Sequence, residues 1–125
     1  MTGESAAPLL VVEDEQSVLG LLATWLNDEG YQIVTCSRYE DARRYLASQT
    51  PAALVTDIRL GAYNGLQLAT VLHDRRPDVP IVIVSAYDDT LMREETRRLG
   101  GVFLVKPLRR EDLISTLREA KASRS

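Results

Sequence analysis

The sequence predicts an α/β fold, a doubly wound parallel sheet of five strands covered by five helices. Two observations indicate this. Five short apolar runs alternate along the chain with longer amphipathic segments, and such alternation is typical of βα units joined by right-handed crossovers. Four of the five runs are also continuously apolar, which is typical of strands that are buried on both faces.

The apolar runs define the expected strands. They cover residues 9–12, 32–35, 52–55, 81–84 and 102–105. The run at 32–35 is the most polar, with Gln32 and Thr35 at its ends. A strand with polar side chains tolerates contact with water, so we expect this run at an edge of the sheet and the other four buried on both faces.

The first two helices follow from apolar stripes and end signals. An apolar stripe over 18–26 has helical spacing, and Gly30 stands where a glycine commonly ends a helix. Ser37 and Glu40 form a capping-box pattern, which predicts the start of the second helix.

The last three helices have similar signals. Asn64 is the expected N-cap of the third helix, which ends before Pro77. The fourth is expected over 90–99 and stops at Gly100. The fifth starts near Arg110. The element order is therefore (βα)₅.

Composition excludes several classes of protein. The chain has 125 residues, of which 45% are apolar and 26% charged, with a net charge of −3. These values suit one globular domain and disfavour direct nucleic-acid binding, which needs a basic field. Cys36 is the single cysteine, which excludes an internal disulfide and a multi-cysteine zinc site.

The ends of the chain carry further expectations. The apolar run at 6–12 is too short to span a bilayer, and the segment before it holds Glu4 but no Lys or Arg, unlike a signal peptide. We therefore expect a cytoplasmic protein with no membrane contact. We expect a single domain over residues 1–125, with flexible ends at 1–7 and 120–125.

Polar side chains follow four of the five expected strands. Sites in a doubly wound sheet form at the carboxyl ends of its strands. If the first and third strands are neighbours, the carboxylates after them converge at one edge. The residues concerned are Glu13 and Asp14 after the first strand, Asp57 after the third, Ser85 after the fourth and Lys106 after the fifth.

These residue types predict a phosphoryl-acceptor site. Three clustered carboxylates repel one another, and either protonation or a bound cation relieves the repulsion. Oxygen ligands without His or Cys favour Mg²⁺. A carboxylate beside this ion is a competent nucleophile toward a phosphoryl group. Lys106 and Ser85 would stabilise the charge on the phosphoryl oxygens during the transfer.

Five motifs, in order, resemble the receiver domain of two-component response regulators. The resemblance runs from about residue 9 to residue 117 and implies a flavodoxin-like (βα)₅ fold with strand order 2-1-3-4-5. The motifs are LLVVEDE (9–15), LVTDIRL (54–60), Asn64-Gly65, IVIVSAY (81–87) and VFLVKPL (102–108).

The resemblance implies a role for each acidic residue. Asp57 corresponds to the phosphoacceptor. Glu13 and Asp14 correspond to the acidic pair that holds Mg²⁺, with Asp14 the more direct ligand. The backbone carbonyl of Arg59 would complete the protein part of the metal shell.

The resemblance also implies roles at the fourth and fifth strands. Ser85 corresponds to the switch hydroxyl that moves toward the phosphoryl group, and Ala86 to the small residue that leaves access to the acceptor. Lys106 corresponds to the lysine that pairs with the phosphate, and the Lys106-Pro107 bond is expected to be cis. Phe103 corresponds to the aromatic switch residue, which rotates inward when Ser85 moves.

The implied function is a signalling switch. A sensor histidine kinase or a histidine phosphotransfer protein would dock near the first helix and phosphorylate Asp57. The surface of the fourth helix, fifth strand and fifth helix would then engage a partner or an output domain, or form a homodimer. Self-phosphorylation and weak autophosphatase activity are expected, but no other catalysis. The arginines near this surface are Arg93, Arg97, Arg98, Arg109, Arg110 and Arg118.

The sequence departs from the family pattern in two loops. Gly61 stands four residues after Asp57, where the family often has Pro, so this loop is expected to be looser. Gly100 and Gly101 replace the usual Gly-Ala pair, and the stretch to Phe103 is one residue short. Because of this change, the family pattern does not define where the fourth helix ends and where the fifth strand starts.

Three other functions remain as alternatives. An aspartate-nucleophile phosphatase or phosphotransferase would carry Asp-x-Asp after its first strand, whereas Asp57-Ile58-Arg59 follows the third and lacks the second Asp. A flavodoxin-like cofactor binder would need a phosphate loop after the first strand, where this chain is acidic. The third alternative is an interaction module that is not phosphorylated.

Overall fold

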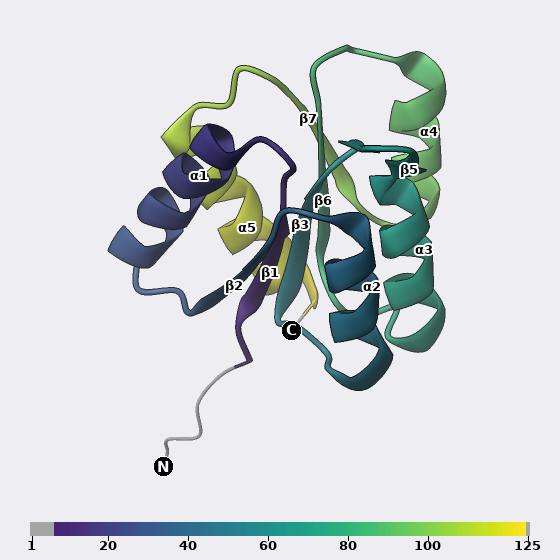
Figure 1. The fold of residues 1–125 in the computed structure, drawn as a ribbon, viewed down its shortest axis with the longest axis horizontal. Helices are drawn as coiled ribbons and strands as arrows, with labels where there is room; N and C mark the ends of the chain where they lie inside the picture. The colour runs from purple at the N-terminus through teal and green to yellow at the C-terminus, as the bar shows by residue number, and fades with distance from the viewer. Residues whose placement is uncertain (1–6, 125) are drawn as a thin grey trace.

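The computed structural model describes residues 7–124, with side chains over 7–122. Five parallel strands form one sheet in the order β2-β1-β3-β6-β7, which confirms the predicted order 2-1-3-4-5 because β6 and β7 are the fourth and fifth strands of this sheet (Figure 1). The strands are β1 Leu9–Val12, β2 Ile33–Cys36, β3 Ala53–Asp57, β6 Ile81–Ser85 and β7 Val102–Val105.

Helices cover both faces of the sheet. Figure 1 shows α1 and α5 on one face and α2, α3 and α4 on the other. The bounds are α1 Gln16–Asp28, α2 Tyr39–Ser48, α3 Gly65–Arg75, α4 Thr90–Arg98 and α5 Arg110–Arg124. Helix α5 includes residues 120–124 of the expected flexible end, whereas residues 1–6 and 125 lie outside the described residues. No helix within 7–124 has the length and apolar character that a bilayer crossing requires.

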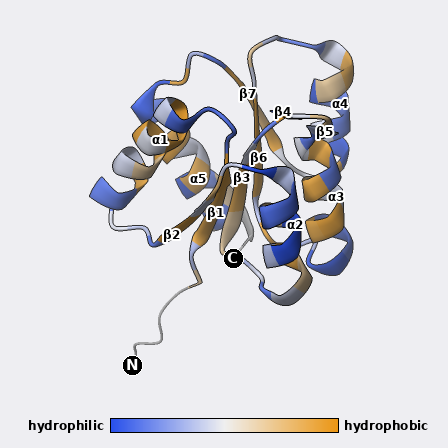
Figure 2. Ribbon diagram, in the orientation of Figure 1, coloured by the Kyte–Doolittle hydropathy of each residue, from blue (hydrophilic) through white to orange (hydrophobic). Residues whose placement is uncertain are grey.

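Alternation along the strands divides the core into two layers. Leu10 and Leu54 point toward α2 and α3 and pack with Leu68, whereas Leu9 and Val55 point the other way, toward α1 and α5. Figure 2 shows the apolar strands between the two layers of helices. Each fully buried Leu or Val side chain contributes about 1.5–3 kcal/mol, so the central strands form a rigid base for the loops at their ends.

The two edge strands differ from each other. The expected edge strand β2 is half-buried, with one exposed residue. The expectation that β7 is buried on both faces was wrong, because Val102 is 36% exposed and Leu104 and Val105 are half-buried. The reason is that β7 has a neighbouring strand on one side only.

The helix ends confirm most of the predicted signals. Asn64 caps α3 with a capping box, in which its Oδ1 accepts from the Leu66 N–H at 2.7 Å and Gln67 Oε1 accepts from the Asn64 N–H at 2.8 Å. The predicted capping box of Ser37 was wrong: α2 begins at Tyr39, and its N-cap residue makes no side-chain cap. A short residue placed one position before the real N-cap cannot reach the N–H groups of the first turn.

The connection from α4 to β7 is short and tightly packed. Gly100 adopts a positive φ of 69° and ends α4 as expected. A Cβ at Gly101 would lie 3.0 Å from the Ile81 carbonyl oxygen and 3.1 Å from Thr96 Cγ2. The second glycine therefore allows α4 to pass directly into β7 at Val102.

A small hairpin after β3 was not predicted. It consists of β4 Arg59–Leu60 and β5 Tyr63–Asn64, which pair antiparallel. Gly61 adopts a positive φ of 63° at the tip, a conformation that glycine reaches without steric cost. Two strands of two residues carry no periodic signal that sequence reasoning could detect.

Candidate acidic site at the carboxyl end of the sheet

The parallel register brings three carboxylates together. Val12 pairs with Thr56 in the sheet, so the next residues, Glu13 just after β1 and Asp57 at the end of β3, lie side by side. One carboxylate oxygen from each of Glu13, Asp14 and Asp57 lies within 4.8 Å of the others. The structure therefore brings together the three acidic residues as the sequence predicted.

The three carboxylates differ in exposure. Glu13 is 2% exposed and Asp57 is 8% exposed, whereas Asp14 is open to solvent. Buried carboxylates are costly unless they are paired or bind a cation. The cluster therefore combines two desolvated carboxylates with one that is exposed to water.

Lys106 supplies the opposite charge. Its Nζ lies 3.0 Å from Glu13 Oε1 and 3.4 Å from Asp57 Oδ2. Burial alone would lower the pKa of Lys106, but the two carboxylates outweigh burial, and the pKa is raised. Lys106 consequently remains an ammonium group between the two buried acids.

Glu13 has a raised pKa. Burial raises its pKa, and the Asp57 charge adds to this, although the Glu15 N–H and Lys106 oppose the shift. The Glu15 N–H donates to Glu13 Oε2 at 3.1 Å. One ammonium does not neutralise three carboxylates. The cluster therefore keeps a net negative charge, which a further cation would neutralise.

The donor atoms fit a hard divalent cation. Three carboxylate oxygens converge, and no His or Cys side chain takes part in the cluster that the described residues form. Such a set, with one carboxylate open to water, matches the preference of Mg²⁺ for a few carboxylate ligands and several waters. The same acidic turn after β1 would repel a phosphate group, which disfavours the flavodoxin-like cofactor site.

Ser85 and Lys106 are placed by adjacent strands. Ser85 pairs with Val105 across β6 and β7, and the Lys106 N–H donates to the Ser85 carbonyl at 2.7 Å. The Ser85 side chain is buried, and its Oγ accepts from the Tyr87 N–H at 3.1 Å. The Lys106-Pro107 bond is cis, as expected.

Gly65 allows α3 to begin directly beside the end of β3. A Cβ at this position would lie 2.1 Å from the Asp57 carbonyl oxygen and 2.9 Å from Thr56 Oγ1. The Thr56 hydroxyl donates to that same carbonyl at 2.9 Å, and the Gly65 N–H donates to the Ile58 carbonyl at 2.8 Å. In the sequence, Gly65 appears only as part of the Asn64-Gly65 motif. A glycine directly after an N-cap residue is the signal that could have indicated the close approach of α3 to β3.

Phe103 lies apart from the acidic cluster, within the core beside Ile83. Its ring is 7% exposed, so it is already buried in this structure. The Arg93 guanidinium lies 4.9 Å from the ring centroid and is held by Asp88 at 2.7 Å. The sequence patterns did not predict that Arg93 of α4 covers the ring of Phe103, because the contact joins residues from two separate elements.

The arginines of the last third do not form one basic surface. On α4, Arg97 pairs with Glu94 and Arg98 with Glu95. On α5, Arg110 and Arg118 contact Glu29 at 2.6 and 2.7 Å. These two therefore join α5 to the end of α1.

Comparison with known proteins agrees with this geometry. The model of the response regulator receiver domain family matches residues 9–118. The transcriptional regulatory protein TdiR of Thauera aromatica is 34% identical over 122 residues, which cover 94% of this chain and 52% of TdiR. The alginate biosynthesis transcriptional regulatory protein AlgB of Pseudomonas aeruginosa is 33% identical over 107 residues, 85% of this chain and 24% of AlgB. The chain thus spans about half of TdiR and a quarter of AlgB.

Solved structures share the fold over nearly the whole chain. A response regulator receiver protein from Sinorhizobium medicae is 26% identical, with a TM-score of 0.88 and coverage of 97% of this chain and 98% of its own. A CheY-like receiver domain from Methanospirillum hungatei, 21% identical, has a TM-score of 0.88 and covers 96% of this chain and 97% of its own. The acidic pocket, the sheet order and the family match together show that this chain belongs to the response regulator receiver domain family.

Proposed function

We propose that Asp57 accepts a phosphoryl group from a sensor histidine kinase or a histidine phosphotransfer protein, and that this changes the surface of α4, β7 and α5. One observation supports this above the others. The Lys106 ammonium contacts the buried Glu13 and Asp57, and the solvent-exposed Asp14 lies in the same cluster. This arrangement holds a carboxylate nucleophile beside the cationic group that would bind the incoming phosphoryl oxygens.

The transfer is an in-line displacement. An Asp57 carboxylate oxygen attacks phosphorus, the bond from phosphorus to the donor imidazole nitrogen breaks, and that nitrogen keeps the electron pair. The product is an acyl phosphate on Asp57. Lys106 and Ser85 stabilise the charge on the phosphoryl oxygens. Attack by water on the acyl phosphate later releases phosphate, which gives the weak autophosphatase activity.

Mg²⁺ is the proposed cofactor. Glu13, Asp14 and Asp57 would hold the ion with carboxylate oxygens, and the backbone carbonyl of Arg59 would add a fourth protein ligand. When bound, the ion neutralises charge on the phosphoryl oxygens. Burial raises the pKa of Glu13, and a bound cation, which favours the carboxylate form, would oppose this shift.

An apolar pocket beside the acceptor is the proposed docking site for the phosphodonor protein. It has a volume of about 370 Å³ and lies between α1 and the loops that follow β6 and β7. Leu21 and Trp25 line it from α1, and Ala86, Lys106 and Leu108 line it from the loops. Leu21 is 49% exposed. Since Lys106 also contacts Asp57, a helix docked here would approach the acceptor directly.

Switching starts at Ser85. In the structure its Oγ is engaged by the Tyr87 N–H, and a phosphoryl group on Asp57 would compete for this hydroxyl. Movement of the loop after β6 would then shift α4 and its contact with Phe103. Exposed Leu91 and Val102, at 64% and 36%, would become part of the partner or homodimer surface. A kinase partner of this kind agrees with the expected cytoplasmic location.

Phosphorylation by a small donor tests the proposal. Purified protein is incubated with acetyl phosphate and MgCl₂, and intact mass is recorded. We expect a gain of one phosphoryl group that EDTA prevents and that hydroxylamine removes, because acyl phosphates are cleaved by this nucleophile. Asp57→Asn should abolish the gain. Asp74→Asn, an exposed acid on α3, should leave it unchanged.

Lys106→Ala tests whether Lys106 acts in the phosphoryl transfer rather than in the binding of Mg²⁺. This variant should still bind Mg²⁺ but gain phosphate at least tenfold more slowly, as expected for the loss of one charge-stabilising group. A wild-type protein that gains no phosphate, or an Asp57→Asn variant that gains it at the wild-type rate, would contradict the proposed function.

A further inference from the structure

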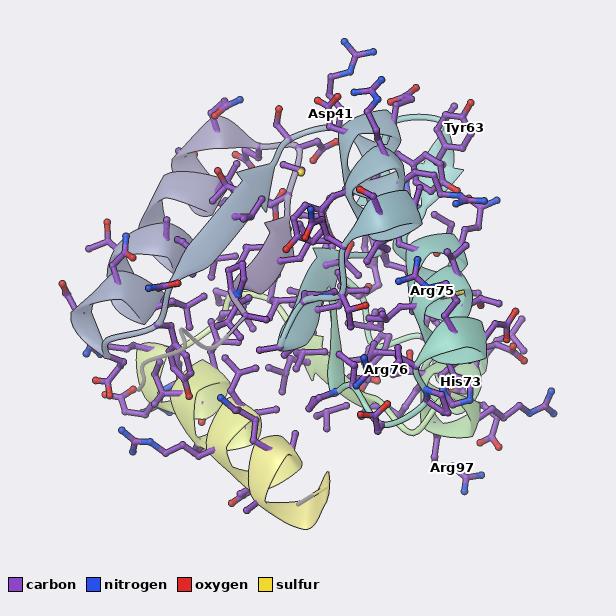
Figure 3. The ribbon with its side chains drawn as sticks, turned by 90° about the horizontal axis from the view of Figure 1, so that it is seen from below. Asp41, Tyr63, His73, Arg75, Arg76 and Arg97 are labelled. Atoms are coloured by element: carbon purple, nitrogen blue, oxygen red, sulfur yellow. The ribbon has the colours of Figure 1, made fainter. Side chains whose placement is uncertain are left out.

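The rings of Tyr39 and Tyr63 stack on each other, with centroids 4.3 Å apart and an interplanar angle of 9°. Tyr39 is the first residue of α2, and Tyr63 begins strand β5 of the small hairpin. In Figure 3, Tyr63 lies toward the same edge of the view as Asp41, which belongs to the first turn of α2. The stack therefore joins the hairpin to a helix from another part of the chain.

The hairpin is weakly held by its own structure. Its ladder consists of two residue pairs, and a hairpin of this length is not stable alone in water. Gly61 at the tip has a positive φ, and Gly61 and Ala62 are exposed. Leu60, at 3% exposure, anchors the outgoing strand in the core. The returning strand is fixed at Asn64, the N-cap of α3, and its other residue, Tyr63, is anchored by the stack on Tyr39.

Helix α2 is rigid enough to provide that anchor. Ala42 and Leu46 are fully buried on its inner face, and Tyr39 itself packs against the same core cluster. Tyr63 is 44% exposed, and its ring stacks on that of Tyr39. Aromatic pairs of this kind stabilise a structure beyond the surface that they bury.

The stack lies in a surface pocket that borders the acidic cluster at Asp14. This pocket of about 300 Å³ is lined by Asp14, by Tyr39 and by residues Leu60, Gly61 and Tyr63 of the hairpin. The hairpin starts two residues after Asp57 and includes Arg59, whose backbone carbonyl is the proposed fourth ligand. A shift of the hairpin would therefore move Arg59 relative to Asp14.

We propose that Tyr63 is a positioning residue for the acceptor site: by stacking on Tyr39 it holds the 59–64 hairpin in the conformation that binds Mg²⁺ and admits the phosphoryl group. The inference rests on the proposed function. If the stack is lost, the hairpin samples other conformations, and metal binding must then include the cost of ordering it. The loss should therefore lower the apparent affinity for Mg²⁺ even without a phosphodonor.

Three variants of Tyr63 test the proposal. Tyr63→Phe keeps the stacked ring, whereas Tyr63→Leu and Tyr63→Ala remove it. Calorimetric titration of the unphosphorylated protein with MgCl₂ should show a roughly two- to tenfold weaker Kd for the Leu and Ala variants, the equivalent of one aromatic pair, and a wild-type Kd for Tyr63→Phe. Phosphorylation by acetyl phosphate at subsaturating Mg²⁺ should slow by the same factor.

Amide hydrogen exchange provides a readout that does not depend on metal or phosphate. In the metal-free protein, exchange at residues 61–63 should be faster in Tyr63→Ala than in wild type and Tyr63→Phe, whereas exchange in β1 and β3 should not change. Asp74→Asn, at an exposed position on α3 outside the acidic cluster, is the control. It should change neither the Kd for Mg²⁺ nor exchange in the hairpin.

The results separate the two proposals. A wild-type protein that binds no Mg²⁺ and gains no phosphate overturns the proposed function. If the wild type does both, and the Leu and Ala variants bind Mg²⁺ with the wild-type Kd, the positioning role of Tyr63 is wrong while the proposed function stands. A loss of affinity in Tyr63→Phe equal to that in Tyr63→Ala would also overturn it, since the hydroxyl rather than the stack would then be responsible.

Discussion

At the residue scale, Glu13 shows how function opposes stability in this domain. A carboxylate that is 2% exposed occupies a place where an apolar side chain would be more stable, and burial raises its pKa. Lys106 offsets part of this cost through the 3.0 Å contact. Perturbed acids of this kind are concentrated at functional sites, which is why Glu13 cannot be understood as a core residue.

Cys36 provides a residue-scale prediction with a pH dependence. Burial, and after it the Asp41 charge, raise the pKa of the Cys36 thiol above its ordinary value of 9.0. At pH 8 iodoacetamide should therefore modify Cys36 more slowly in the native protein than in concentrated urea. Because the folded state keeps the proton to higher pH, the thiol should also lower the free energy of unfolding as the pH rises through 9.

The Asp41 contribution can be isolated. Asp41→Asn should speed the native reaction of Cys36 at pH 8 by roughly two- to threefold, since removal of a nearby negative charge favours the thiolate. Asp74→Asn is the control on another helix and should have no effect. Equal alkylation rates in the native and the urea-unfolded wild type would contradict the assignment.

At the element scale, glycines decide how closely elements approach. Gly65→Ala would place a Cβ 2.1 Å from the Asp57 carbonyl oxygen, so α3 must move away from β3. We expect a loss of about 1–3 kcal/mol in the free energy of unfolding, the usual cost of overpacking, measured by urea denaturation.

Gly20→Ala is the matched control for Gly65→Ala. Gly20 lies inside α1, and no atom lies within 4 Å of the position that an alanine Cβ would take there, so alanine should stabilise the helix by about 0.5–1 kcal/mol. If Gly65→Ala and Gly20→Ala changed the free energy of unfolding in the same direction, the close approach of α3 to β3 would not explain the effect of Gly65→Ala.

The elements also show which structural features the sequence could predict. The strands and helices followed from continuous apolar runs and 3.6-residue periodicity, and the acidic cluster followed from strand ends that share one edge. The β4–β5 hairpin and the cover of Phe103 by Arg93 were not predictable in this way. The strands of the hairpin have two residues each, too few for a periodic signal, and the contact of Arg93 with Phe103 depends on how α4 packs beside β7.

The exposure of β7 was missed for a related reason. Its four apolar residues resemble those of β6 in sequence, yet β6 is fully buried and Val102 of β7 is 36% exposed. Apolar composition reports that a strand belongs to the sheet, but the position at the edge is set by the strand order. The order came from the family resemblance rather than from the run itself.

At the scale of the whole molecule, metal binding should be visible in global stability. A ligand that binds only the folded state raises the free energy of unfolding, by about 1.4 kcal/mol at ten times its Kd. We therefore expect MgCl₂ to raise the midpoint of urea unfolding, whereas NaCl at equal ionic strength should not. Asp14→Asn, at an exposed position, should abolish the increase while it leaves the metal-free midpoint nearly unchanged.

A negative outcome of the magnesium experiment would be equally clear. If Asp14→Asn responds to MgCl₂ as strongly as the wild type does, the ion acts elsewhere on the surface. Asp74→Asn should retain the full response, because this acid lies on α3 outside the cluster.

The two contacts of Glu29 with Arg110 and Arg118 tie the end of α1 to α5 on one face of the sheet. Helix α4 lies on the other face (Figure 1) and packs on the core through Met92 and the buried Thr96, so the proposed shift of α4 would leave α1 in place. A fluorescent dye attached to α4 would therefore report activation, and a second dye on α1 would serve as a stationary reference. Energy transfer between the two would follow the switch in a single molecule.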